Sequence, residues 1–207
     1  VRYFVMGTGE WKSAPTWPPP GLAARDLYLH SSASAEGTLM DAQPTETSTG
    51  TYHYDPRDPL PTLWTRNLMA GASDRSRLNY RKDVLRYRTE PLATDIEIAG
   101  SPELVLYASS SAVDTDFFAW LVNEYPDGKA IEVCYGMVRA RHRNGRDQED
   151  FLTPGVTTEF RIRLGPTACC FRAGNRIRVD ISSSDFPNFD RNHNTGKNDL
   201  IDCELRT

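Results

Sequence analysis

The sequence predicts an all-β protein in which two antiparallel sheets pack face to face as a sandwich, with the strands connected as a jelly roll. Short runs of apolar, aromatic and β-branched residues recur along the chain and are separated by turn residues. The 207 residues include 14 Gly and 14 Pro, which suits a fold with many turns. No stretch of a dozen residues has a helical apolar period. A sandwich of short strands fits all three observations.

The clearest pair of elements is a hairpin in the middle of the chain. Apolar runs at 117–122 and 131–138 lie on either side of the sequence Tyr-Pro-Asp-Gly at 125–128. Proline presets φ, aspartate bonds its local backbone and glycine tolerates positive φ, so this sequence predicts a turn. We therefore expect the two runs to pair as antiparallel strands near the middle of a sheet.

Most other expected strands alternate apolar and polar residues, as half-buried strands do. Residues 94–101 are an example, because Ile96 and Ile98 fall on one face. In chain order, the strands expected outside the hairpin are 1–6, 26–30, 38–40, 51–54, 84–87, 94–101, 102–109, 157–164, 176–182 and a short one at 203–205.

Two segments are not expected to be regular elements. Residues 11–21 contain three consecutive prolines, which remove backbone donors and exclude a central strand or a helix. Trp11 and Trp17 could pack this segment against the sandwich or meet a partner. Residues 63–77 carry apolar side chains without a period and are predicted to form a long loop. Long loops in compact domains are often functional or interfacial.

The composition indicates one domain over residues 1–207 and excludes some partners. There are 24 basic and 28 acidic residues, and the net charge of −4 gives no sign of a nucleic-acid partner. We interpret the scattered arginines as part of a solvated strand face. No apolar run approaches the roughly 20 residues of a membrane span, so no membrane partner is expected. No signal peptide opens the chain, and Val1 in place of Met suggests a fragment.

The cysteine pattern favours a reducing compartment. Cys134, Cys169, Cys170 and Cys203 include no C-x-x-C pair. The adjacent pair at 169–170 should point to opposite faces of a strand. We expect reduced cysteines in a cytoplasmic protein, and a single disulfide that uses Cys203 is the alternative.

The sequence assigns no catalytic residue to this chain. A serine hydrolase of the α/β type needs a G-x-S-x-G nucleophile elbow between a strand and a helix. The best approximation is Ser73, which lacks the second glycine and the following helix.

A polar loop near the C-terminus is the only candidate for a metal site. His193 lies there with Asp185, Asp190 and Asn194, which could offer oxygen ligands to calcium. The alternative is a loop held by Asx-turns. No other histidine has a metal-ligand spacing, so we predict no metal and no cofactor.

Paired carboxylates precede the central hairpin. Asp114 and Asp116 have the spacing that puts both side chains on one face of a strand. Such a pair could hydrolyse glycosides in a free-standing glycosidase, or it could bind arginines of a neighbouring strand. Trp64, Trp120 and Tyr125 could form a sugar-stacking platform, although Trp120 lies in a core-like run. A stand-alone carbohydrate-binding module is therefore an alternative.

Taken together, the motifs resemble a known domain. The chain is similar to the C-terminal jelly-roll domain, of galactose-binding-domain-like type, in the X-prolyl dipeptidyl aminopeptidase and cocaine-esterase (CocE/NonD) family of serine hydrolases. The resemblance covers nearly the whole chain. The matching stretches are 1–7 with Trp11 and 17–19; 27–29; 54–56 with Pro59 and Pro61; 114–117; 125–128; 174–178; 186–187; 190–192; and 194–196.

The resemblance implies a role inside a larger enzyme that hydrolyses acyl esters or X-Pro peptides. In that family the Ser-Asp-His triad lies in an N-terminal α/β-hydrolase domain, and the jelly roll packs against it and closes one side of the active-site cleft. Residues 63–74 of the long loop are the segment implied to reach the cleft, with Leu68 and Met69 as pocket-lining residues and Trp64 as a ligand-facing aromatic. An unpaired strand edge near the C-terminus would favour a homo-oligomer.

Overall fold

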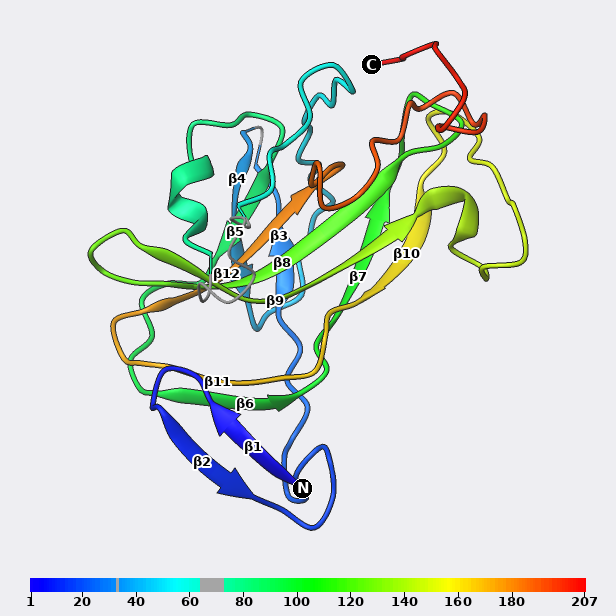
Figure 1. The fold of residues 1–207 in the computed structure, drawn as a ribbon. Helices are drawn as coiled ribbons and strands as arrows, with labels where there is room; N and C mark the ends of the chain where they lie inside the picture. The colour runs from blue at the N-terminus through cyan, green and yellow to red at the C-terminus, as the bar shows by residue number, and fades with distance from the viewer. Residues whose placement is uncertain (33, 64–72) are drawn as a thin grey trace.

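The structure is a computed structural model that describes residues 1–32, 34–63 and 73–207. Strands and two short 3-10 helices are the regular elements of these residues, so the predicted all-β class is confirmed (Figure 1). The elements are β1 Arg2–Val5, β2 Glu10–Ser13, β3 Tyr28–His30, β4 Glu36–Met40, η1 Arg75–Leu78, β5 Leu85–Arg88, β6 Ile96–Gly100, β7 Glu103–Ala108, β8 Asp116–Glu124, β9 Ala130–Arg139, η2 Ala140–His142, β10 Thr158–Arg163, β11 Thr167–Phe171 and β12 Arg176–Ser182.

One layer is a six-stranded sheet with the order β3-β4-β5-β12-β8-β9. Its neighbouring strands are antiparallel, except that β4 and β5 are parallel. The predicted hairpin is formed by β8 and β9, and its turn is closed by the Gly128 N–H, which donates to the Tyr125 carbonyl at 2.9 Å. Gly128 has a φ of 88°, as the turn requires. Within the described residues β9 is the edge strand, so the hairpin lies at one side of the sheet rather than at its middle.

Three shorter ladders build the opposing layer. β11 pairs with β6, β10 pairs with β7, and β1 pairs with β2. The first two ladders continue each other, because the Leu164 N–H donates to the Pro102 carbonyl at 2.9 Å between them. The third is joined to β11 through Met6, whose N–H donates to the Ala168 carbonyl at 3.0 Å. In Figure 1 the β1–β2 hairpin lies at the end of the molecule opposite the C-terminus.

The alternation of β8 fills two cores. Phe117, Ala119 and Leu121 point into the main core between the layers, where Phe160 and Phe171 meet them. The side chains between them, Phe118, Trp120 and Val122, point to the other face and form a second core with Leu60, Leu78, Val84 and Ala130. β8 is therefore buried on both sides, which explains why its sequence is a continuous apolar run rather than an alternating one.

Four details differ from the expected strands. Residues 51–54 form no ladder, because their tyrosines are held by side-chain bonds: the hydroxyls of Tyr52 and Ser183 lie 2.6 Å apart, and that of Tyr54 donates to the Asn192 carbonyl. Residues 203–205 are not a strand either. Two strands lie outside the expected ranges: β2, and β11, of which the sequence placed only the pair Cys169 and Cys170 on a strand. β2 begins before the proline run and pairs only with β1 in the described part of the chain.

The adjacent cysteines lie as the sequence predicts. All four cysteines are free, and Cys203 is the exposed one. Cys169 lies in the main core and Cys170 in a small cluster with Val5 and Trp17, on opposite faces of β11 as predicted. Burial raises the pKa of the Cys134 and Cys169 thiols to about 12. No helix in the described residues has the length and apolarity to cross a membrane.

Candidate functional site

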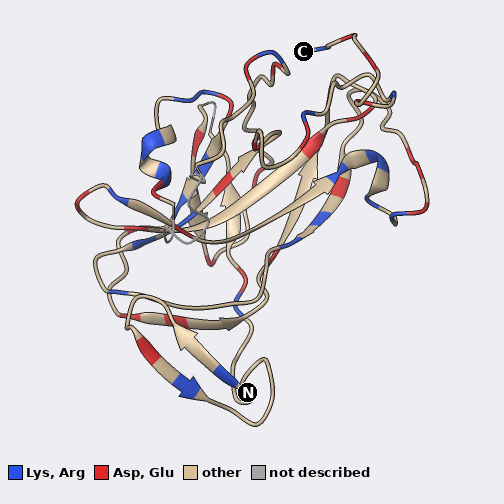
Figure 2. Ribbon diagram, viewed as in Figure 1, with Lys and Arg blue, Asp and Glu red and all other residues tan. Residues whose placement is uncertain are grey.

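The candidate site is the outer face of the six-stranded sheet, which we define as the face directed away from the opposing layer. Alternate residues of β5 and β12 bring charged side chains to it, among them Arg86, Arg178 and Asp180, because their neighbours Leu85, Ile177 and Ile181 point into the main core. η1 covers this face next to Trp120. β5 carries two arginines, and β12 carries two arginines and one aspartate, each separated from the next by an uncharged residue (Figure 2).

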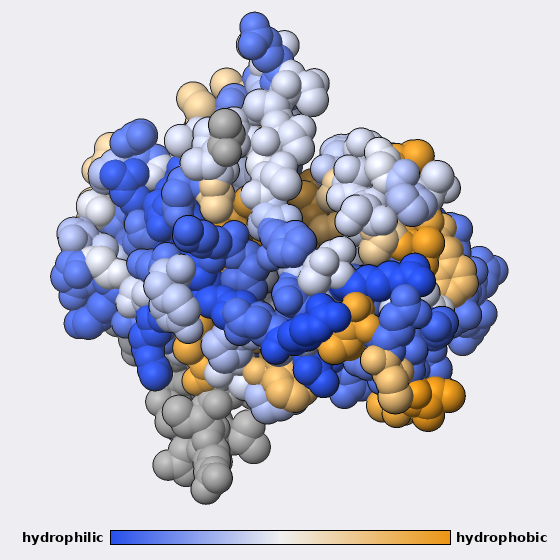
Figure 3. Space-filling view, turned by 90° about the horizontal axis from the view of Figure 1, so that it is seen from above, coloured by the Kyte–Doolittle hydropathy of each residue, from blue (hydrophilic) through white to orange (hydrophobic). Residues whose placement is uncertain are grey.

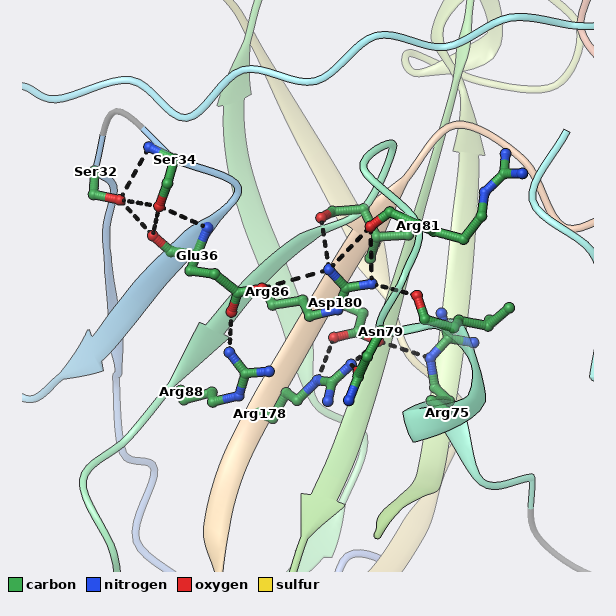
Figure 4. Close-up of polar contacts among 12 residues, drawn as sticks. Ser32, Ser34, Glu36, Arg75, Asn79, Arg81, Arg86, Arg88, Arg178 and Asp180 are labelled. Atoms are coloured by element: carbon green, nitrogen blue, oxygen red, sulfur yellow. Dashed lines mark hydrogen bonds and ion pairs between the residues drawn. The ribbon is translucent and has the colours of Figure 1, made fainter. Parts of the chain in front are cut away.

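Asp180 is the centre of a buried ion network on this face (Figure 4). Its carboxylate accepts hydrogen bonds from Arg75 Nε at 2.9 Å and from Arg178 Nε at 2.6 Å, and its side chain is 1% exposed. Burial by itself favours the neutral acid, but the two guanidinium groups outweigh it, so the pKa of Asp180 lies below its ordinary value. Asp180 is therefore ionised at neutral pH, and its one negative charge is shared by two buried cations.

The network extends along β5 and β12 toward β4. Arg178 Nη1 donates to Glu124 at 2.9 Å, and Glu124 also accepts from Arg88 at 2.8 Å. Arg88 reaches Glu36 on β4, which lies 3.5 Å from Arg86. Each of the three carboxylates, Asp180, Glu124 and Glu36, thus joins two arginines, so one chain of ion pairs crosses the sheet. These contacts correct our interpretation of the arginines, because Arg86 and Arg178 are 2% and 0% exposed rather than solvated.

Arg75 closes the network at its outer end. Its guanidinium carbon lies 3.8 Å from the centre of the Trp120 ring, and its Nη1 lies 3.7 Å from Glu132 Oε2. Its Nη2 is buried and has no hydrogen-bond partner among the described residues. Burial raises the pKa of the Glu132 carboxyl, and Arg75 offsets this only in part.

The chain on both sides of residues 64–72 is fixed beside this network. Before them, the Thr62 N–H donates to the Phe186 carbonyl at 2.8 Å. After them, the Ser73 carbonyl accepts from the Glu132 N–H at 2.9 Å, and Asp74 Oδ1 accepts from the Ala130 N–H at 3.0 Å. Asp74 also caps η1 by accepting from the Ser76 N–H. The two flanks are therefore held by the sheet and by the loop that follows β12.

This geometry gives Ser73 a structural role. Its carbonyl extends the edge of β9, and a 3-10 helix follows it instead of the turn into an α-helix that a nucleophile elbow needs. The ring nitrogens of His30 and His142 are bonded to the Ala42 and Gln148 carbonyls. No hydrogen bond joins a histidine to Ser73 in the described part of the molecule.

The carboxylates of Asp114 and Asp116 do lie together, and both are bound by neighbours. Arg139 donates to both oxygens of Asp116, at 2.9 and 3.0 Å. The Asn192 amide bridges the pair, donating to Asp114 at 2.9 Å and to Asp116 at 3.0 Å. Both aspartates are 0% exposed. This arrangement ties the start of β8 to β9 and to the loop after β12, and it leaves no path for a glycoside to reach either carboxylate.

The loop around His193 does not gather metal ligands. The His193 N–H donates to Asp199, while Asp185 accepts from Asn188 three residues away. The described residues hold no group of three or more His, Cys, Asp or Glu placed to bind a metal ion. Asn194 has a φ of 63°, and its N–H donates to the Asn192 side chain, an Asx-type contact of the kind that holds loops.

The aromatic platform is not formed by the described candidates. Trp120 is 1% exposed and lies under Arg75, so it belongs to the second core. Trp17 packs edge-to-face against Tyr3, whereas Trp11 is exposed. Trp64, Leu68 and Met69 lie outside the described residues. One sequence signal was misinterpreted. Charged residues alternate with uncharged residues along β5 and β12, and this pattern belongs to a buried ion network rather than to a solvated surface.

The comparisons with known proteins identify the class. Residues 1–203 match the family described as "X-Pro dipeptidyl-peptidase C-terminal non-catalytic domain". The chain is 42% identical to a cocaine esterase of Rhodococcus sp. (strain MB1 Bresler) over 205 residues, which are 95% of this chain and 36% of the esterase. It is 28% identical to a putative serine esterase of Mycobacterium bovis, over 91% of this chain and 33% of that protein.

Solved structures give the same result. An aminopeptidase of a marine sediment archaeon (Thaumarchaeota archaeon) superposes with a TM-score of 0.87 at 27% identity, over 98% of this chain and 36% of that one. An α-amino acid ester hydrolase superposes with a TM-score of 0.86 at 26% identity, over 94% of this chain and 35% of that one. The chain thus spans about a third of the length of the relatives it matches.

The fold and the site define a β-sandwich domain whose described polar clusters hold the fold together. The chain belongs to the C-terminal, non-catalytic domain family of the X-Pro dipeptidyl-peptidase and cocaine-esterase (CocE/NonD) hydrolases.

Proposed function

We propose that this chain is the accessory domain of a larger serine hydrolase. Its partner is an N-terminal α/β-hydrolase domain of the same polypeptide, which supplies the nucleophilic serine, the histidine base and the oxyanion hole for acyl transfer. The observation that carries the proposal is the family match over residues 1–203, in a chain about a third as long as its relatives. The carboxylates of Asp114, Asp116 and Asp180 also support it, because each is bound by arginine or asparagine side chains of this chain.

The substrate class that we propose for the whole enzyme is an acyl ester. The 42% identity to a cocaine esterase and the superposition on an α-amino acid ester hydrolase favour it. An X-Pro peptide is the second candidate, since the family description names an X-Pro dipeptidyl-peptidase and one of the similar structures is an aminopeptidase.

The role that we propose for the domain is to wall one side of the active-site cleft. Leu68 and Met69 contact the acyl part of the substrate, and Trp64 faces the ligand. The anchoring of Thr62 and Ser73 supports this role, because it fixes where the chain leaves the sandwich and where it returns.

We also propose that the enzyme is cytoplasmic and that the domain supports a homo-oligomer. The four free cysteines, three of them buried, favour a reducing compartment. The β6–β7 side of the opposing layer has no neighbouring strand among the described residues, and such an edge can pair with a second copy.

The cleft-wall role is tested with the full-length enzyme. Turnover of a p-nitrophenyl acyl ester and of an X-Pro-p-nitroanilide identifies the substrate class. Leu68→Ala with Met69→Ala should then raise KM for the preferred substrate about tenfold, because two apolar contacts to its acyl group are lost. Tyr107→Ala, an exposed change on β7, is the control and should leave KM unchanged. Equal KM values in both variants would reject the cleft-wall role.

A further inference from the structure

We infer that the sandwich carries a second contact surface, at the end where β1 and β2 extend past the six-stranded sheet, and that it binds the catalytic domain of the same polypeptide. We call it the overhang surface and define it by Phe4, Trp11, Tyr125 and Ile131 with the cavity between them. The inference rests on the proposed function and names the surface by which the two domains meet.

Aromatic side chains are exposed on one face of the β1–β2 hairpin. Phe4 and Trp11 are directly opposite in the register, their ring centres are 5.5 Å apart, and they are 43% and 60% exposed. Arg2 lies over the Trp11 ring at 4.9 Å. Tyr3 and Val5 point the other way and pack with Trp17. Large aromatics with an arginine are the composition typical of an interface centre.

The same face continues into a cavity of about 240 Å³. Met6 and Cys169 form its floor and reach the main core, while Tyr125, Ile131 and Val133 of the β8–β9 hairpin form its other side. The six-stranded sheet therefore leaves a cavity at this end of the opposing layer, although Cys169 itself is buried. Together with the exposed Phe4 and Trp11, this cavity forms one apolar surface, and contiguous apolar surface marks an interaction site.

The position of the surface indicates which partner covers it. Glu132 lines the cavity, and its N–H holds the Ser73 carbonyl, so the overhang surface is continuous with the anchor of the segment for which we propose the cleft contact. A domain that contacts the sandwich beside Glu132 therefore lies next to the cavity. The opposite end of the molecule, which carries the C-terminus, is mainly hydrophilic (Figure 3). About two thirds of the length of the cocaine esterase relative has no counterpart in this chain. The partner that we infer is the catalytic domain in that remaining part of the polypeptide.

Hydroxyl-radical footprinting of the full-length enzyme tests the inference. Trp11 and Tyr107 are 60% and 66% exposed in the chain, so Tyr107 is an internal control on β7. Normalised to the urea-unfolded enzyme, oxidation of Trp11 should fall about tenfold more than that of Tyr107, because a docked interface centre excludes water. Comparable oxidation of the two residues would overturn the inference. Protection of Trp11 that disappears on dilution to monomers would also overturn it, in favour of a second copy.

Ester hydrolysis by the same preparation separates this inference from the proposed function. An active enzyme with unprotected Trp11 rejects the overhang surface alone, whereas an inactive enzyme counts against the proposed function. As a second test, Phe4→Ser with Trp11→Ser should shorten the half-life of activity on heating about tenfold, corresponding to a weakened interface, while Tyr107→Ser leaves it unchanged. Equal half-lives in the two variants would contradict the inference.

Discussion

At the scale of single residues, Asp180 holds two buried arginines in the sheet. Asp180→Asn keeps the shape of the side chain but leaves Arg75 and Arg178 without their shared negative partner. We expect the free energy of unfolding to fall by about 3–5 kcal/mol, the cost of leaving a buried charge unpaired. Urea unfolding of the chain measures it.

Glu103→Gln is the matched control for this change. Glu103 pairs with Arg161 at the surface, and an exposed pair contributes below about 1 kcal/mol. A loss for Asp180→Asn as small as that of the control would contradict the account of the buried network.

Glu132 gives a pH dependence of opposite sign to that of an ordinary salt-bridged acid. Its pKa is raised above 4.5, so in the window just above pH 4.5 only the folded state keeps the proton. The free energy of unfolding therefore falls as pH rises through this window and then becomes constant. Glu132→Gln removes this loss, so its stability advantage over the native chain should increase with pH above 4.5.

Urea unfolding at several pH values checks this prediction. Glu10→Gln, an exposed change on β2, serves as the control and should follow the native chain at each pH. An advantage of Glu132→Gln that shrinks with rising pH would show that Arg75, and not burial, determines the state of Glu132.

At the scale of elements, close approach of β9 to β10 depends on Gly136. A Cβ atom at this position would lie 2.2 Å from the Arg163 carbonyl oxygen, which belongs to the backbone and cannot turn away. We expect Gly136→Ala to lower the free energy of unfolding by about 1–3 kcal/mol through overpacking. Gly165→Ala is the control, since nothing lies within 4 Å of its Cβ position. Equal unfolding midpoints for the two variants in urea would contradict this packing.

Trp120 and Trp11 contribute differently to stability, because the first is buried in the second core and the second is exposed. Trp120→Ala empties the second core under Arg75 and should cost about 3–5 kcal/mol. Trp11→Ala in the same chain should change stability by less than about 0.5 kcal/mol, because the side chain is 60% exposed. Thermal unfolding of both variants checks this. A large loss for Trp11→Ala would mean that the β1–β2 hairpin is part of the core and not an available surface.

The elements also show what a sequence can predict. The β8–β9 hairpin was predictable because its turn residues and apolar runs are local signals. The buried position of Arg178 and Asp180 was not, since an alternating strand of this composition is usual at a surface, and burial depends on η1, which is distant in the chain. The pairing of Asp116 with Arg139 and Asn192 likewise needs three separate segments to meet. Residues 51–54 were wrongly predicted because tyrosine-rich segments favour strands, although these tyrosines are held by side-chain bonds.

At the scale of the whole molecule, the described polar clusters all connect elements of the sandwich. Asp114 and Asp116 join β8 to the last loop, and Asp180 joins β12 to η1. A catalytic serine or histidine poised for acyl transfer is not found among residues 1–32, 34–63 and 73–207. We therefore expect the chemistry of the enzyme to depend on the domain that this chain supports.

Hydrolysis of a p-nitrophenyl acyl ester, by the purified chain and by the full-length enzyme side by side, tests this account most directly. The account predicts turnover by the full-length enzyme and no turnover above the buffer rate by the chain alone. Turnover by the chain alone would contradict it. In that case Ser73, Asp114 and Asp116 would be the residues to substitute first.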